Sequence, residues 1–146
     1  MIAYIQGEVL SIGPDNLVVL TNSGVGYKLF VTQAERVQVR QGEKIFLHTY
    51  LVVREDSLSL YGFASEQDRD FFTLLLGVNG IGPRIALAIL SSLTVEAIRR
   101  AVLSEQADIF SRVPGVGKKN AQKILLHRLG IHLPRRLRRF DEVVQM

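Results

Sequence analysis

The chain of 146 residues carries 18 Lys and Arg against 14 Asp and Glu, a formal net charge of +4, with 47% hydrophobic residues and no cysteine. This composition belongs to a folded globular protein, not a disordered or fibrous one, and the length suits one ordinary domain or two small ones. The missing cysteines exclude disulfides, thiolate metal sites and cysteine nucleophiles, as suits a reducing cytoplasm. No basic segment precedes an apolar run at the amino end, and the longest apolar stretch (85–90) is too short for a bilayer, so we expect no signal peptide and no membrane partner.

The charge is unevenly distributed along the chain. Residues 1–62 hold five basic and six acidic side chains, net −1, whereas residues 63–146 hold thirteen and eight, net +5. Within the second part, residues 113–140 contain eight basic side chains and no acidic one. Such a run either forms a solvated surface or binds a polyanion, and charge alone does not decide between the two.

The first third of the chain has the pattern of a small β domain. Segments rich in β-branched and aromatic residues alternate with Gly, Pro, Asn and Asp turns, and one short helix is expected near residues 33–37. The expected strands are 2–9, 17–21, 27–31, 45–53 and 58–61. Five short strands with hairpin connections favour a closed or nearly closed antiparallel barrel of the OB type over residues 1–63.

From Ser65 onward the apolar residues recur with a period of about 3.6, which predicts a helical second domain over residues 64–130. Ser65 and Asp68 resemble a capping box with an aspartate in the usual glutamate's place, and Thr94 is the expected N-cap of a later helix. The expected helices are 65–77, 83–91, 94–104, 107–112 and 118–129. The chain is therefore predicted to be an α+β multidomain protein, ending in a basic tail (131–146) that we expect to be partly disordered.

The helical part contains an internal repeat. Residues 75–90 (LLGVNGIGPRIALAIL) align with residues 110–125 (FSRVPGVGKKNAQKIL) at an offset of 35, with six of sixteen positions identical. Each copy has the order helix, apolar-x-Gly-apolar-Gly, helix, and Ile81 matches Val116 in type. A repeat at a fixed offset indicates that one supersecondary unit occurs twice.

The repeated pattern predicts a tight turn with positive φ at its glycines and an aliphatic plug between two helices. The turn presents main-chain N–H groups at the start of the second helix, where the helix dipole also favours an anion. A DNA phosphate, bound without reading the base sequence, is the expected ligand. One such turn is common in helical hairpins, but two copies in the same frame indicate DNA binding, and Arg84, Lys118 and Lys119 add positive charge beside the amides.

The common nucleotide-binding loops do not fit these glycines. A Walker A loop needs a glycine where Arg112 stands and Ser or Thr where Lys119 stands, and a dinucleotide fingerprint needs a third glycine at Ile85 or Asn120. We therefore expect no cofactor in this chain, and any ATP used in its task would be hydrolysed by another protein.

Each repeat unit resembles the helix-hairpin-helix motif. Together with the opening MIAYIQGEV and the LYGF sequence at residues 60–63, the pair resembles the RuvA family, bacterial subunits that bind Holliday junctions, over residues 1–126. The resemblance implies a homotetramer, or a face-to-face octamer, that holds a four-way DNA junction open and square planar and grips each arm through the minor groove. It also implies cooperation with a RuvB-type ATPase motor, which uses ATP and Mg²⁺, and with a RuvC-type resolvase in recombination, DNA repair and the SOS response of bacterial cytoplasm.

The resemblance also assigns roles to individual positions. The positions implied to contact DNA are Asn79, Gly80, Ile81, Gly82, Arg84, Gly115, Val116, Gly117, Lys118 and Lys119. Glu55 and Asp56 correspond to an acidic pin at the junction centre, on the hairpin between the fourth and fifth strands, where carboxylates would repel phosphates. Taken without the resemblance, these two residues form an ordinary solvated turn. Pro114 stands where the first unit has Asn79, so the two units are not expected to contribute equally.

The sequence departs from the family at its carboxyl end. Family members continue into a small third helical domain that contacts the motor, and residues 131–146 are too few to form it. The resemblance therefore implies junction binding by this sequence and leaves open direct contact with the motor. The basic cluster between Arg135 and Arg139 matches no family feature.

Two other functions compete with that of a non-catalytic DNA-binding scaffold. A helix-hairpin-helix glycosylase or lyase needs a base-flipping pocket and a catalytic Asp or Lys, and Asp141 lies in the basic tail with no domain after it. A general nucleic-acid-binding OB module stacks bases on exposed aromatic residues over a basic groove, whereas this barrel is net −1 and its aromatic residues are expected in the core. Those aromatic residues are Tyr4, Tyr27, Phe30, Phe46, Tyr50 and Tyr61. The three histidines lack metal-site spacing, so no metal is expected.

Overall fold

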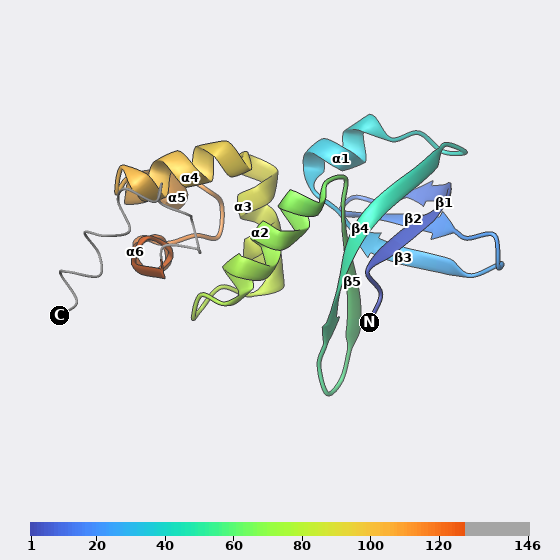
Figure 1. The fold of residues 1–146 in the computed structure, drawn as a ribbon, viewed down its shortest axis with the longest axis horizontal. Helices are drawn as coiled ribbons and strands as arrows, with labels where there is room; N and C mark the ends of the chain where they lie inside the picture. The colour runs from blue at the N-terminus through green and yellow to red at the C-terminus, as the bar shows by residue number, and fades with distance from the viewer. Residues whose placement is uncertain (128–146) are drawn as a thin grey trace, which may run out of the picture.

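The structure is a computed structural model that describes residues 1–127, a β-barrel with a group of helices beside it (Figure 1). The predicted tail, including Asp141 and the basic cluster, lies outside the described residues. The strands are β1 (Tyr4–Ile12), β2 (Asn16–Leu20), β3 (Gly26–Phe30), β4 (Lys44–Val53) and β5 (Leu58–Phe63). The helices are α1 (Gln33–Gln38), α2 (Glu66–Leu76), α3 (Pro83–Ser92), α4 (Val95–Leu103), α5 (Ala107–Ser111) and α6 (Lys118–His127).

The five strands close into a barrel in the order β1, β2, β3, β5, β4. Strand β1 closes the barrel because its first half, Tyr4 to Glu8, pairs with β4 and its second half, Glu8 to Ile12, pairs with β2, with a register shift between Val9 and Ser11 inside the second pairing. This double pairing explains why β1 runs on to Ile12, beyond the predicted end at residue 9. The predicted OB-type barrel is confirmed.

One pairing differs from the purely antiparallel barrel that the sequence predicted. Strands β3 and β5 are parallel, with Leu29 opposite Leu60 and Phe30 opposite Tyr61. The chain leaves β3, passes through α1 and β4, and returns along β5 in the direction of β3. Hairpin signals in a sequence report only sequential neighbours, so this non-sequential pairing has no local signature.

The apolar core consists of two clusters of buried residues. The aliphatic interior of the barrel forms one cluster, and a second runs from β5 into all of the helices after it. Phe72 of α2 has no exposed surface, and its ring centroid lies 4.9 Å from that of Tyr61 and 5.0 Å from that of Phe63, both on β5. The Tyr50 ring of β4 meets the same side chain edge-on at 5.9 Å. These contacts fix α2 against the barrel.

A buried carboxylate lies where the chain passes from the barrel to the helices. Glu35 of α1 accepts a hydrogen bond from the Ala64 N–H, while its Oε2 atom is buried without a hydrogen-bond partner among residues 1–127. Burial raises the pKa of Glu35 from 4.5 to about 7, although the Ala64 hydrogen bond opposes this shift and the charge of Asp68 adds to it. The Glu35 carboxyl group therefore loses its proton, and the stability that the neutral form provides, as pH rises through the physiological range.

Replacing Glu35 with Gln is expected to remove a loss of stability toward alkaline pH. Because the folded chain binds this proton more tightly than the unfolded chain, its contribution to stability is full below about pH 4.5 and declines as pH rises through about 7. Glu35→Gln keeps an oxygen for the Ala64 N–H and cannot ionise, so its melting temperature should exceed that of the wild type at about pH 8 and approach it at about pH 5. Circular dichroism melting curves measure this, with the exposed Glu66→Gln as control; parallel pH profiles for the wild type and Glu35→Gln would contradict it.

Candidate nucleic-acid interface

The two repeat units fold as two copies of one helix-hairpin-helix. Helices α2 and α3 flank the first hairpin, and α5 and α6 flank the second. The N–H of Ile81 donates to the Val78 carbonyl at 3.0 Å, and the N–H of Val116 donates to the Val113 carbonyl at the same distance. Val78, Ile81, Val113 and Val116 are all buried, including Ile81 and Val116, the two predicted plugs between helices.

Only the first glycine of each hairpin has the positive φ that the sequence predicted for both. Gly80 has φ +87° and Gly115 has φ +89°, whereas Gly82 is extended at φ −88° and ψ 176°. A Cβ atom on Gly82 or Gly117 would meet nothing within 4 Å. Neither backbone conformation nor internal packing requires glycine at these second positions. A side chain there would instead occupy the space through which an external molecule reaches the helix N-terminus.

In the second hairpin, single alanine changes separate the two roles of glycine, which are to adopt a positive φ at Gly115 and to leave open space at Gly117. Gly115→Ala should destabilise the fold by about 1–2 kcal/mol, because an L-residue is strained at positive φ. Gly117→Ala should leave the melting temperature unchanged and weaken DNA binding several-fold, because its methyl group projects into the approach path. Thermal unfolding and filter binding to linear duplex on both variants measure these effects. A Gly117→Ala protein with full affinity would count against phosphate contact at this glycine.

The helices that follow the hairpins have N-termini suited to an anion. Neither α3 nor α6 has an acidic residue in its first turn, and the N-cap of α3, Gly82, makes no side-chain capping bond. In contrast, α2 and α4 are capped as predicted, by Ser65 Oγ accepting from the Asp68 N–H and Thr94 Oγ1 accepting from the Ala97 N–H, each at 3.1 Å. The partial positive charge at the N-termini of α3 and α6 is thus available to an external hydrogen-bond acceptor.

Basic side chains surround both hairpins, and one of them was missed by the sequence. Arg84, Lys118 and Lys119 are exposed beside the turns, as predicted. A Cβ on Gly80 would meet Asn120 Oδ1 at 3.0 Å and Lys123 Nζ at 3.4 Å, so α6 of the second unit also supplies a cation to the first hairpin. The repeat gave no signal for this role, because the position equivalent to Lys123 in the first unit is Ala88.

The two hairpins differ at one exposed position. Asn79 of the first and Pro114 of the second occupy the same place in the repeat, and both are exposed. Asparagine offers a side-chain amide and a backbone N–H, whereas proline offers neither donor. The first hairpin therefore has more hydrogen-bond donors than the second at this position.

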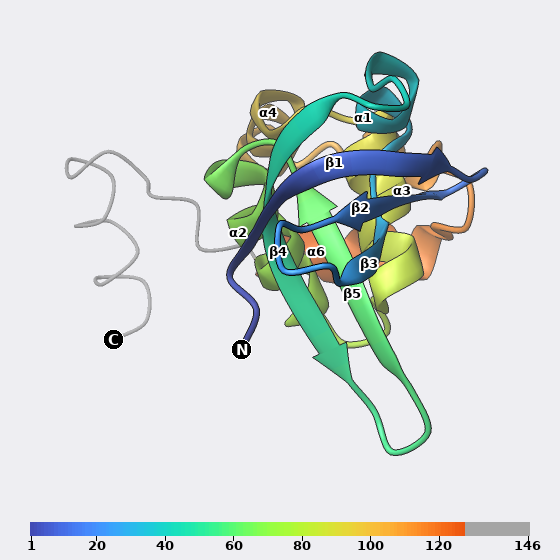
Figure 2. The same ribbon diagram turned by 90° about the vertical axis from the view of Figure 1, so that its right-hand side faces the viewer.

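The β4–β5 hairpin projects away from the barrel, as Figure 2 shows. The Arg54 N–H donates to the Ser57 carbonyl at 2.9 Å and closes the turn, leaving Glu55 and Asp56 exposed at its tip. The predicted pin residues therefore lie at the end of an arm.

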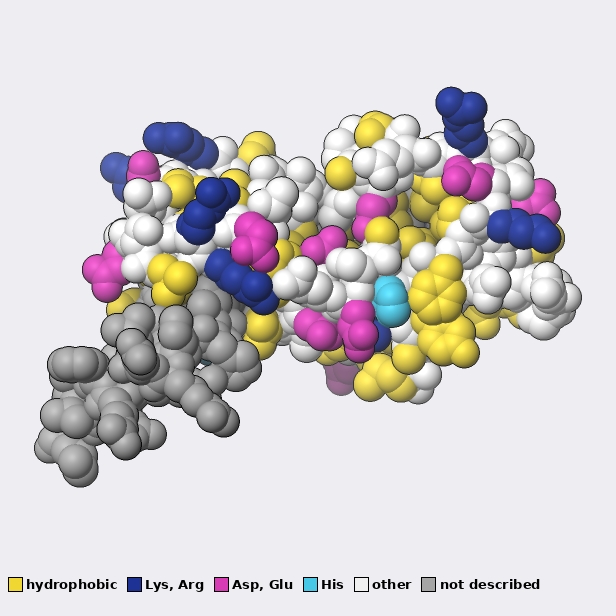
Figure 3. All heavy atoms as spheres, turned by 45° about the horizontal axis from the view of Figure 1, so that its top comes forward, with side chains coloured by type: hydrophobic (Ala, Val, Ile, Leu, Met, Phe, Trp, Pro, Cys, Tyr) yellow, Lys and Arg dark blue, Asp and Glu magenta, His cyan; other side chains and the backbone are white. Residues whose placement is uncertain are grey.

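Two barrel aromatic residues that the sequence placed in the core lie on the surface instead. Tyr4 is 61% exposed and Phe46 is 45% exposed; their rings stack at 5.1 Å, and Phe46 meets the His48 ring edge-on at 5.1 Å (Figure 3). The signal was present in the alternation, because Tyr4 shares a strand face with Gln6 and Glu8. We refer to Tyr4, Phe46 and His48 as the aromatic cluster.

The surroundings of the aromatic cluster do not resemble a groove for single-stranded nucleic acid. The neighbouring Ala3 carbonyl accepts from Arg69, which is itself paired with Glu66 and Asp70 at 3.2 Å. Acidic side chains lie beside the cluster in Figure 3, whereas single-strand sites combine aromatic rings with a basic track. The alternative function of a general nucleic-acid-binding OB module is thus supported by the exposed aromatic rings, but the basic track that such a site needs is not found around them in the described part of the chain.

Two absences hold for the part of the chain that the structure describes. Residues 1–127 contain no group of three or more His, Asp or Glu side chains placed to hold a metal ion. No helix within that range is long and apolar enough to cross a membrane.

The fold and the paired hairpins define a helix-hairpin-helix protein joined to an OB-type barrel. Residues 1–62 match the family model described as the RuvA N terminal domain, and residues 72–128 match the model described as a SAM-like helix-hairpin-helix tandem. The chain belongs to the RuvA family.

Curated relatives carry the name "Holliday junction branch migration complex subunit RuvA". The protein of Symbiobacterium thermophilum is 47% identical over 127 residues, which cover 86% of this chain and 62% of the relative. The protein of Thermobifida fusca is 46% identical over 130 residues (89% and 64%), and that of Mycolicibacterium smegmatis is 43% identical over 126 residues (86% and 64%). The chain thus spans less than two thirds of the length of these relatives.

Proposed function

We propose that this chain binds four-way DNA junctions and is the DNA-binding subunit of a branch-migration complex. The observation that carries the proposal is the presence, on one chain, of two exposed amide-bearing hairpins and a projecting arm tipped by Glu55 and Asp56. The name shared by the relatives, which refers to Holliday junctions and branch migration, supports the same function.

The hairpins and the arm are proposed to act on phosphates in opposite ways. Backbone N–H groups at the starts of α3 and α6, with Arg84, Lys118, Lys119 and Lys123 beside them, attract phosphates of duplex arms irrespective of sequence. Ile81 and Val116 plug their hairpins and hold these amides in place. The carboxylates of the arm repel phosphates and so disfavour a strand that approaches the crossover in the wrong arm.

We propose that the chain acts as a homotetramer, because a junction has four arms and each copy carries one arm-gripping pair of hairpins. Four copies with a charge of +4 each would give a strongly basic assembly around an acidic centre. We assign the aromatic cluster to contact between copies, because it is apolar and exposed and because the neighbouring Arg69 is already paired with Glu66 and Asp70. Light scattering of the chain with and without junction DNA tests this; a monomer in both states would contradict it.

The chain itself is proposed to perform no catalysis. A RuvB-type motor would hydrolyse ATP with Mg²⁺, and a RuvC-type resolvase would cut the junction, so that this subunit serves recombination, repair and the SOS response in the cytoplasm. The relatives' description as a subunit of a complex supports a partner motor. ATPase stimulation of a RuvB-type protein by this chain on junction DNA measures that contact.

A gel-shift comparison tests the junction assignment directly. A four-way junction and a linear duplex of the same arm sequence are titrated with the chain in excess competitor DNA. The junction should bind more tightly, because it alone engages hairpins from several copies at once. Equal affinity for the two DNAs would contradict the proposed function.

Neutralising the arm should affect strand separation more than binding. Replacing Glu55 with Gln and Asp56 with Asn removes two charges that oppose phosphate, so junction affinity is expected to be retained or increased. Reactivity of thymines at the crossover toward permanganate, which detects unpaired bases, should fall. A clear loss of junction affinity would show that the carboxylates attract rather than repel the DNA they meet.

A further inference from the structure

A cleft of about 380 Å³ separates the β4–β5 hairpin from the first turn of α3. Val52 of β4 pairs with Ser59 of β5, and Val52 and Arg54, the residue directly after β4, both line the cleft. This face of the hairpin forms one wall, and Gly82 and Arg84 belong to the other. The cleft thus lies between two elements already assigned to DNA, the acidic arm and the first helical hairpin.

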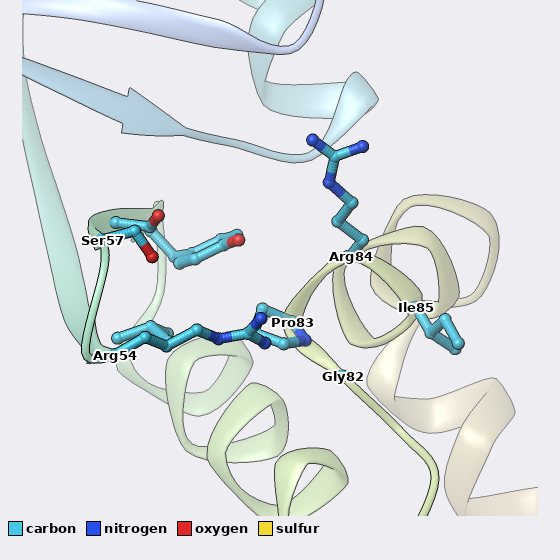
Figure 4. A pocket seen from close by; sticks show the side chains of 9 residues that line it. Arg54, Ser57, Gly82, Pro83, Arg84 and Ile85 are labelled. Carbon is cyan, nitrogen blue, oxygen red and sulfur yellow. The ribbon is translucent and has the colours of Figure 1, made fainter.

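Its polar side chains are all suited to donate hydrogen bonds. Two guanidinium groups and three hydroxyl groups line the cleft, and no carboxylate does. Within residues 1–127, Arg54 and Arg84 form neither an ion pair nor a side-chain hydrogen bond. Figure 4 shows Arg54 extending from the hairpin toward Pro83, while Arg84 leaves the start of α3 in another direction. Both side chains are exposed and come from separate elements, so both guanidinium groups are available to an anion that enters the cleft.

Tyr61 provides a second, independent indication of a ligand. The residue is only 6% exposed and lines the cleft, and its hydroxyl, which makes no hydrogen bond with another described residue, is not buried and so reaches the cleft. Burial raises the pKa of Tyr61 above 10.0, against the lowering effect of Arg84 and Arg54, and Asp15 raises it further. At neutral pH the group is therefore a neutral O–H donor close to both cations.

The rest of the Tyr61 side chain shows what kind of anion fits. Its ring packs at 5.4 Å from Phe30 and 4.9 Å from Phe72, so the ring belongs to the core and cannot stack on a base. The cleft therefore offers donors for a phosphate group without a platform for a nucleobase. A phosphodiester in a DNA backbone meets this requirement, and a free nucleotide would leave its base without a partner.

We propose that the cleft holds one backbone phosphate of a DNA strand at the junction crossover, through Arg54, Arg84 and the Tyr61 hydroxyl. The inference rests on the proposed function and adds Arg54 and Tyr61 to its DNA-binding residues. Arg54 directly precedes Glu55 and Asp56, so a strand held in the cleft passes beside the carboxylates that repel it. Arg54 on the side of the arm would attract the phosphates of the strand, while Glu55 and Asp56 at the tip would repel them.

Methylphosphonate substitution, which removes the charge of a single phosphate, tests this assignment. A series of four-way junctions carries one such group at each phosphate flanking the crossover, and each junction is titrated with wild type and with Arg54→Gln. The wild type should lose about tenfold in affinity at one or two positions, the size of one charge-assisted contact. Arg54→Gln should bind the unmodified junction about tenfold more weakly and should be insensitive to modification at those positions.

Controls separate the alternatives. Arg40→Gln removes the same charge from an exposed arginine outside the cleft and should keep the wild-type sensitivity profile. If Arg54→Gln also keeps that profile, the cleft assignment is overturned while junction binding stands; if the wild type binds junction and duplex equally, the proposed function itself fails. Inorganic phosphate at matched ionic strength should not displace the junction, and displacement that depends on Arg54 would assign the cleft to a free anion instead.

Discussion

Changing Lys118 and Lys119 together to Glu is expected to weaken binding to a four-way junction and to linear duplex alike, by about 100-fold at moderate salt. Both lysines are exposed at the start of α6, beside backbone N–H groups that face no acidic side chain in that turn. Reversing their charge replaces attraction by repulsion at the point where the phosphate would lie. The loss should be the same for all sequences, because these contacts do not reach base edges.

The salt dependence of this variant supplies a second readout. The slope of log affinity against log salt should become shallower by about 0.9 for each phosphate that the protein no longer neutralises. Arg40→Glu combined with Arg100→Glu makes the same change in net charge at exposed positions outside both hairpins and should alter affinity far less. Unchanged affinity for the lysine variant would reject the second hairpin as a DNA-binding element.

Replacing Phe72 with Ala is expected to lower the free energy of unfolding by about 3–5 kcal/mol, the usual cost of removing a buried phenyl ring. The ring is fully buried among Tyr50, Tyr61 and Phe63, so the change would leave three barrel residues without their packing partner on α2. For a chain of this size the melting temperature should fall by about 10–20 °C. Calorimetry should also show a broader or two-step transition, because this ring would no longer join the barrel to the helices.

Leu74 offers a matched control on the same helix. Its side chain is 37% exposed, so Leu74→Ala should cost less than about 1 kcal/mol and keep a single transition. A Phe72→Ala protein as stable as this control would mean that the aromatic contacts do not couple the two parts of the molecule. DNA binding of Phe72→Ala well below its melting temperature should persist, because the hairpins keep their own buried plugs, Ile81 and Val116.

The sequence predicted the elements well because their signals are local. Period-two alternation located the strands, and the repeat located both hairpins, with Gly80 and Gly115 at positive φ and Ser65 and Thr94 as caps. These features depend on residues within a few positions of one another, so a single sequence contains them. The roles of the DNA-contact and pin residues came from family resemblance and remain predictions.

What the sequence could not supply were relations between distant segments. Parallel pairing of β3 with β5, the approach of Lys123 to Gly80, and the cleft shared by Arg54 and Arg84 each join residues that are far apart along the chain. The second glycine of each hairpin was predicted with the wrong backbone conformation, because an open approach path and a strained turn both call for glycine.

The aromatic bridge between barrel and helices has a mechanical consequence. Because Phe72 joins α2 to β5, and β5 is also one strand of the arm, the arm and the first hairpin are attached to the same packed aromatic rings. Under the proposed function, a migrating junction would slide past these two elements while their attachment keeps them together. Each base-pair step would bring a new phosphate to the same amides, and contacts that do not depend on base identity would be equally favourable at every step.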